Sequence, residues 1–129
     1  MTRQIQILLD DVAIAGKLQE SPTAELIWEA LPIESEGNRW GDEIYCNIPV
    51  KSELDDAAKE SVEVGDLGYW PPGQAFCIFF GPTPISQGRE IRPASAVNIV
   101  GRVVADLGVL KGVSSGCKVR IEKLERDST

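Results

Sequence analysis

The chain has 129 residues, a hydrophobic content of 43% and a formal net charge of −7, from 20 acidic and 13 basic residues. These values predict one globular domain over residues 1–129 and argue against binding to nucleic acid, which requires cationic side chains against phosphates. The sequence contains no histidine, which excludes the usual catalytic triads and the commonest transition-metal ligand.

Cysteine usage and missing motifs exclude further classes of protein and of binding site. The three cysteines form no C-x-x-C pair, so we expect buried thiols, no zinc site and no metal. The odd cysteine count, together with an N-terminus in which we expect no targeting segment, predicts a reducing cytoplasm. Glycine-rich phosphate loops are missing, so no cofactor is expected. No apolar run approaches the roughly 20 residues needed to cross a bilayer, so we expect no membrane partner.

The chain begins with a predicted β-hairpin followed by a helix. Residues Arg3–Leu9 alternate between apolar and polar, and Val12–Leu18 return as a second strand. Ser21 is a typical N-cap, Pro22 suits the first helical position, and Pro32 ends the helix. We expect this helix to close one end of a barrel.

A second hairpin is predicted next. Residues Ile33–Arg39 form a polar extended stretch, and Gly41 and Asp42 provide the turn into a strand over Ile44–Ile48. The segment Ser52–Glu60 has a helix-forming composition but little apolar face, so we expect a surface helical turn or a loop.

The segment Gly65–Pro84 concentrates five of the eight aromatic residues and four of the eight prolines. Residues Leu67–Trp70 predict a short strand, and Pro71–Gly73 predicts a tight turn in which the glycine is free to adopt positive φ. Residues Ala75–Phe80 form a continuous apolar run that is typical of a strand buried on both faces.

The remainder predicts a loop, two strands and a turn between them. Residues Ile85–Pro93 form the loop, Ala96–Val104 and Cys117–Leu124 form the strands, and Asp106–Gly112 is a turn or a single helical turn. The polar tail 125–129 is expected to fray. About eight short strands and one good helix predict a mainly β fold, a closed or nearly closed barrel with short helical turns.

Four segments of the chain resemble one family: WGDEIY at 40–45, GDLGYWPPG at 65–73, FFGPTP at 79–84 and PASAVN at 93–98. This is the group of small prokaryotic proteins of unknown function that adopt a cyclophilin-like β-barrel. The resemblance implies a closed eight-stranded barrel. True cyclophilins isomerise X–Pro bonds with an arginine in an F-x-R-x-I setting. The matching stretch here, IESEGNRW, lacks that motif, so the catalytic role is transferred to neither Arg39 nor Arg92.

A ligand pocket can be proposed from residue types alone. Its candidate apolar walls are Trp40, Tyr45, Tyr69, Trp70 and Phe76, and its candidate polar anchors are Arg39, Glu43, Arg92, Ser95 and Asn98. Each has a structural alternative. In these alternatives, Tyr69 and Trp70 pack in the core, Arg39 and Glu43 form an ion pair across the hairpin, Ser95 caps a turn, Arg92 is only solvated, and Asn98 satisfies backbone groups of the long loop. Among adjacent carboxylates, Asp42 and Glu43 are the best acid–base candidates, because aromatic residues flank them.

Three functions remain open from the sequence. The first is binding of a peptide or small molecule without turnover. The second is peptidyl-prolyl isomerisation, which needs only to favour the twisted amide over the planar one. The third is a structural or partner-binding subunit, for example a homodimer. The lack of histidine and of the cyclophilin arginine motif favours the first.

Overall fold

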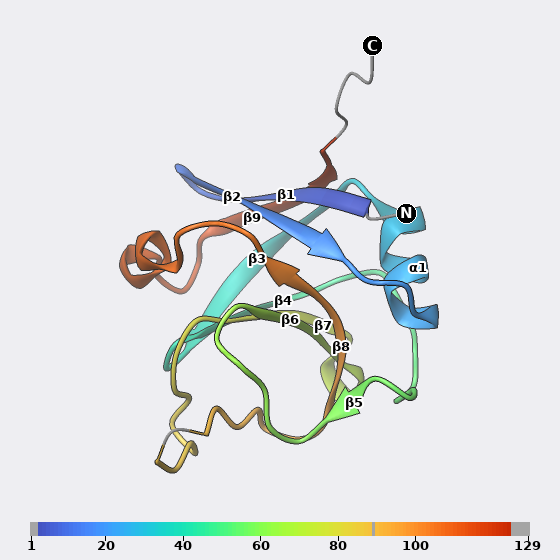
Figure 1. Cartoon of the computed structure of the whole chain (residues 1–129). Helices are drawn as coiled ribbons and strands as arrows, with labels where there is room; N and C mark the ends of the chain where they lie inside the picture. The colour runs from blue at the N-terminus through green and yellow to red at the C-terminus, as the bar shows by residue number, and fades with distance from the viewer. Residues whose placement is uncertain (1–2, 89, 125–129) are drawn as a thin grey trace.

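The computed structural model describes residues 3–88 and 90–124, and Figure 1 shows their arrangement. The elements are β1 Arg3–Leu9, β2 Val12–Leu18, α1 Pro22–Ala30, β3 Ile33–Trp40, β4 Glu43–Asn47, β5 Ala58–Lys59, β6 Asp66–Trp70, the 3-10 turn η1 Pro71–Gly73, β7 Ala75–Phe79, β8 Val97–Val103, the 3-10 turn η2 Leu107–Gly112 and β9 Lys118–Lys123.

Among the described residues, eight strands form a closed antiparallel barrel. Their order is β2-β1-β9-β3-β4-β7-β6-β8, and a pairing between β2 and β8 closes the ring. The two-residue strand β5 pairs with the first two residues of β8, Val97 and Asn98. This confirms the predicted barrel with one main helix and short helical turns.

The barrel interior follows from the alternation of the strands. Ile5, Ile7 and Leu9 of β1 are fully buried, and β9 adds Val119 and Ile121 from the neighbouring strand. Their intervening neighbours lie on the outer face, so each strand contributes every second residue to the core.

The helix α1 closes one end of the barrel, as predicted, on the right in Figure 1. The Ser21 hydroxyl accepts a hydrogen bond from the Ala24 N–H, and Pro22 occupies the first turn. Ala24 and Ile27 belong to the same buried cluster as the barrel interior. The turn η2 lies across the barrel from α1 and buries Leu110 in that cluster.

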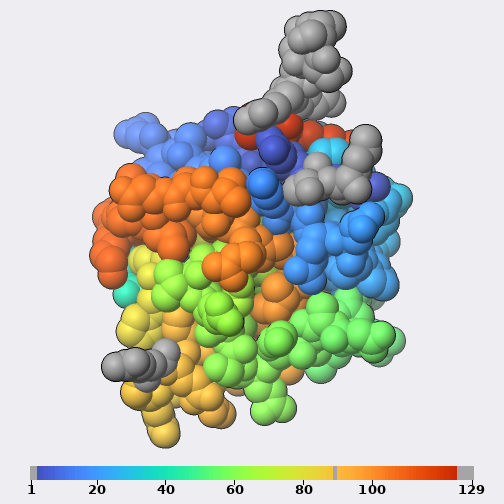
Figure 2. Space-filling model, viewed as in Figure 1, coloured from blue at the N-terminus to red at the C-terminus, as the bar shows by residue number. Residues whose placement is uncertain are grey.

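A second apolar cluster lies outside the barrel wall. Strand β7 is buried on both faces, as predicted: Phe76 and Ile78 belong to the barrel core, whereas Cys77 and Phe79 belong to the outer cluster. The segments 51–65, 81–88 and 90–96 supply the cover for this face, and Figure 2 shows them in the lower half of the view. The candidate site lies in this outer layer.

The loop alternative for residues 52–60 is confirmed: they form no helical turn, and the loop carries β5. The expectation for the Pro71–Gly73 turn needs correction. The positive φ of the Pro71–Gly73 turn falls at Gln74 (φ 46°), whereas Gly73 is needed because a Cβ there would lie 2.7 Å from the Trp70 ring. The tail 125–129, expected to fray, lies outside the described residues.

The seam between β2 and β8 generates a prediction about barrel closure. A Cβ on Gly101 would lie 2.1 Å from the backbone oxygen of Lys17, so Gly101→Ala must push the two strands apart. We expect a loss of about 3 kcal/mol in the free energy of unfolding, measured by urea denaturation.

Two glycines serve as controls for that measurement. Gly16→Ala, where the nearest atoms lie at 3.2 Å, should cost about 1 kcal/mol. Gly112→Ala meets nothing within 4 Å and should change stability by less than about 0.5 kcal/mol. Equal effects at Gly101 and Gly112 would contradict the close approach at the seam.

Candidate ligand-binding site

The alternation of β4 places two of the candidate side chains outside the barrel. Ile44 and Cys46 belong to the interior core, so Glu43 and Tyr45 lie on the outer face. The two-residue turn at Gly41 and Asp42 pairs Trp40 of β3 with Glu43 and brings that tryptophan to the same face.

Residues from two further elements complete a cavity of about 140 Å³ on this face. Trp70 comes from the end of β6, and Val97 begins β8. The loop before β8 contributes Pro93 and Ala94. The described residues that line the cavity are Trp40, Glu43, Tyr45, Trp70, Pro93, Ala94 and Val97.

Glu43 is the unusual member of this lining. The residue is only 5% exposed, and its Oε1 has no hydrogen-bond partner among the described residues. Burial raises the pKa of Glu43 to about 7, and the Cys77 thiol beneath it offsets part of that rise. At neutral pH the cavity therefore contains a carboxyl group poised between its charged and neutral forms.

Trp70 is held in place by its surroundings. Its indole Nε1–H donates a hydrogen bond to the Ser95 hydroxyl at 2.7 Å, and Gly73 lies against its ring. Ser95 itself lines a separate, broad and open hollow, together with Tyr69 and Pro71. The hydrogen bond between Trp70 and Ser95 thus links the cavity lining to the lining of this hollow.

Three candidates lie on the inner face instead. Phe76 packs in the barrel core opposite Tyr69, whose hydroxyl donates to the Val50 carbonyl at 2.6 Å. Asn98 is fully buried: its amide donates to the Thr23 hydroxyl (2.9 Å) and the Glu53 carbonyl (2.8 Å). Its oxygen accepts from the Asp55 N–H at 2.8 Å. Asn98 therefore ties the 51–57 loop to α1.

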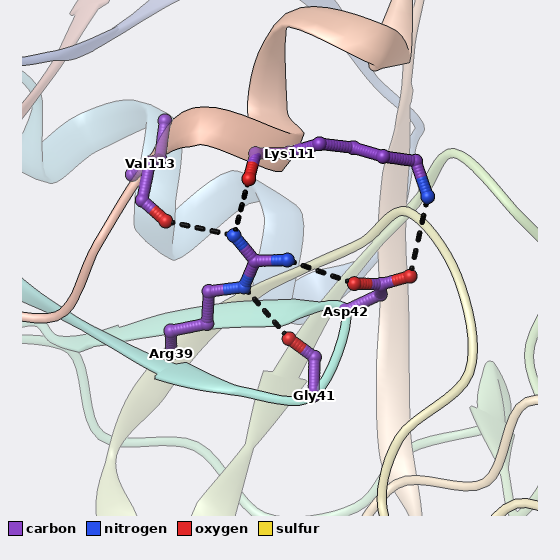
Figure 3. Close-up of polar contacts among 5 residues, drawn as sticks. All are labelled: Arg39, Gly41, Asp42, Lys111 and Val113. Carbon is purple, nitrogen blue, oxygen red and sulfur yellow. Dashed lines mark hydrogen bonds and ion pairs between the residues drawn. The ribbon is translucent and has the colours of Figure 1, made fainter.

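The expected ion pair between Arg39 and Glu43 is wrong. Arg39 is paired in register with Ile44 and points to the face opposite Glu43. Its guanidinium donates to the carbonyls of Gly41, Lys111 and Val113 and to the carboxylate of Asp42, as Figure 3 shows. The same guanidinium lies 5.1 Å from the centroid of the Phe80 ring. Arg39 therefore fastens η2 to the β3–β4 hairpin at one end of the barrel.

The Asp42 and Glu43 carboxylates have different surroundings, although the two residues are adjacent in sequence. Asp42 is neutralised by Arg39 and Lys111, at 2.9 and 3.4 Å. Glu43 remains on the other face, so the two carboxylates do not form an acid–base pair. Arg92 lies on the surface, with its side chain 46% exposed and paired with Glu90.

The sequence reasoning missed three members of the cavity lining, Pro93, Ala94 and Val97. The first two stand in an irregular loop with no periodicity to assign a face. The alternation of β8 could have placed Val97, because Asn98 and Val97 must point to opposite faces.

The described residues hold neither a cluster of metal-ligating side chains nor a membrane-spanning helix. No group of three or more histidine, cysteine, aspartate or glutamate side chains within them is arranged to hold a metal ion. No helix within them is long and apolar enough to cross a membrane.

Comparison with known proteins places the chain in a family. A model of the cyclophilin-like family matches residues 3–122, and the chain belongs to this family. A hypothetical protein from Archaeoglobus fulgidus, AF2241, is 46% identical, with a TM-score of 0.82 over 95% of both chains. McbB, solved in complex with tryptophan, shares the fold at 18% identity and a TM-score of 0.71, over 97% of this chain and 46% of McbB. No curated protein matches significantly.

The two arginines should differ sharply in their contribution to stability. Arg39→Met removes the four hydrogen bonds of a side chain that is 26% exposed, and we expect a loss of about 2 kcal/mol in urea denaturation. Arg92→Met is the matched control and should cost less than about 0.5 kcal/mol. Similar losses in both variants would show that the Arg39 contacts do not hold η2.

Burial of Glu43 should make stability depend on pH. The folded protein holds a proton on Glu43 up to about pH 7, whereas the unfolded chain releases it near the ordinary glutamate pKa of 4.5. The folded state thus binds more protons between these values, so this group's contribution is fully present below about pH 4.5 and is lost as pH rises through 7. The whole loss is roughly 3 kcal/mol.

The Glu43→Gln variant isolates this effect. Measured by urea denaturation, its stability relative to wild type should rise by roughly 3 kcal/mol between pH 4.5 and pH 8. Glu29→Gln removes the same charge from an exposed position on α1 and controls for net charge. A difference between Glu43→Gln and wild type that does not change with pH would rule out a buried proton on Glu43.

Proposed function

We propose that this protein binds a small molecule in the cavity between Trp40, Glu43, Tyr45 and Trp70. The observation that carries the proposal is the Glu43 carboxyl, buried with an unpaired oxygen in an otherwise apolar lining. An unpaired buried polar group is unfavourable for folding, so its presence in a preformed cavity favours a binding role.

The dimensions of the cavity limit the ligand. An apolar cavity of about 150 Å³ takes a benzene-sized molecule, and this one has about 140 Å³. It therefore suits a single ring or a short branched group rather than a folded peptide. McbB, which shares the barrel fold, is a case in which a protein of this fold was solved with a small molecule, tryptophan.

The described residues that line the cavity support ligand binding better than they support prolyl isomerisation. They include no arginine: Arg39 points to the opposite face and Arg92 lies on the surface.

We also propose a cytoplasmic location for the protein. The three buried cysteines, each free in the described structure, support it.

A blocked variant tests the proposal. Ala94 is exposed at the cavity, so Ala94→Leu should fill the entrance without disturbing the core. Fragments of up to about ten heavy atoms should shift the indole N–H signals of Trp40 and Trp70 in NMR spectra of the wild type. We expect affinity for such fragments to fall at least tenfold in Ala94→Leu.

The matched control is Ala96→Leu, two residues further along and facing the broad hollow instead. It should retain fragment binding. A library in which no fragment moves the two indole signals, or in which Ala94→Leu leaves every affinity unchanged, would refute the proposed site.

A further inference from the structure

We propose that the ligand of this cavity carries a small organic ammonium group, which binds between the aromatic walls and pairs with the Glu43 carboxylate. The inference rests on the proposed function, because it names the chemical class of ligand for the same cavity.

The charge around the cavity selects for a cation. Glu43 is the one acidic or basic side chain among its described lining residues, apart from the phenol of Tyr45. Arg39 is directed to the opposite face and already bonded to Asp42, and Arg92 is a surface residue paired with Glu90. An anionic ligand would thus meet a buried carboxylate with no compensating positive group, which is strongly unfavourable.

The aromatic walls select for an organic rather than an inorganic cation. Hard metal ions require several oxygen ligands, whereas the lining around Glu43 consists of Trp40, Tyr45, Trp70 and aliphatic groups. The faces of tryptophan and tyrosine attract ammonium groups through the electron-rich ring, and the attraction is stronger where water is excluded. An alkylammonium can contact these rings through its carbon atoms and the carboxylate through its charge.

The unpaired Oε1 explains why an apolar ligand fits less well than an ammonium. An apolar molecule would leave this buried oxygen without a partner, as it is in the unliganded protein. An ammonium group satisfies it by a charge-assisted contact. The volume of about 140 Å³ accommodates a head group of roughly six heavy atoms, and the exposed Ala94 marks where the rest of the ligand leaves.

Binding of such a ligand must be linked to the protonation of Glu43. The titratable groups that face this carboxyl are the Cys77 thiol on β7 and the Tyr45 phenol on β4. Burial raises the pKa of Cys77 well above its usual range, so the thiol stays neutral near pH 7. Glu43 is thus the group that ionises, and an ammonium ligand displaces its proton.

The test compares charged probes with neutral molecules of the same shape. Choline and n-butylammonium are the charged probes, and 3,3-dimethylbutan-1-ol and butan-1-ol are their neutral counterparts. Isothermal titration at constant ionic strength should show that at least one ammonium probe binds at least tenfold more tightly than its neutral counterpart at pH 8. The affinity of that probe should fall about tenfold between pH 8 and pH 6, because Glu43 has a pKa of about 7.

Two variants separate this inference from the proposed function. Glu43→Gln keeps the shape of the side chain and should lose the preference for ammonium while binding the neutral alcohols as before. Ala94→Leu should weaken every probe. Indole N–H signals of Trp40 and Trp70 confirm that each variant is folded and report on occupancy of the cavity.

The possible results are distinguishable. Neutral and charged probes that bind equally well, or an ammonium preference that survives Glu43→Gln, would overturn the ammonium assignment and leave the cavity as a binding site. A wild type that binds no ammonium probe would also overturn the assignment, and the fragment experiment would then decide the cavity itself.

Discussion

The sheet formed by β4, β7, β6 and β8 is buried on both faces, and this constraint decides which of the candidate side chains on these strands reach the cavity. Strand β7 sends Phe76 and Ile78 to the barrel core and Cys77 and Phe79 to the outer cluster. Neighbouring residues in a strand point to opposite faces, so each strand of this sheet divides its side chains between two apolar environments. The outer environment contains the cavity, because the loop before β8 covers it incompletely.

Glu43 makes this outer layer less stable than it needs to be. An apolar side chain of similar size would bury the same surface without removing a charge from water. Domains are stabilised by only about 5–15 kcal/mol, so a contribution of a few kcal/mol from one carboxyl is a large fraction. Such groups occur preferentially where a ligand or a reaction uses them. The aromatic rings around Glu43 fit this interpretation, since they provide walls for a ligand but no hydrogen bond for Oε1 in the described structure.

Most of the fold could be predicted from sequence because its signals are local. Alternation defined β1 and β2, Ser21 and Pro22 marked the start of α1, and the unbroken apolar run marked β7 as buried on both sides. The two-residue turn at Gly41 and Asp42 even contained the information that Trp40 and Glu43 share a face. The ion pair of Arg39 with Glu43 was wrong because that same alternation separates them.

The rest of the site depends on contacts that no local pattern encodes. Pro93 and Ala94 reach the cavity through an irregular loop, whose path is set by packing against distant strands. Tyr69 and Trp70 are adjacent and aromatic, yet one enters the barrel core and the other lines the cavity. Composition identified the residues that gather in the region, whereas only the register of the strands decides which of them meet.

Membership of the cyclophilin-like family fixes the barrel and leaves the chemistry to the site. An isomerase must bind the twisted amide more tightly than the planar one. In this chain, the arginine at the end of β3 holds η2 in place, so its donors are already occupied. The cavity on the other face of the same hairpin offers a carboxyl group and aromatic rings, which stabilise positive charge. The same two strands thus place a cation in the scaffold and an anion in the cavity, and this separation favours a ligand of positive charge over a neutral peptide.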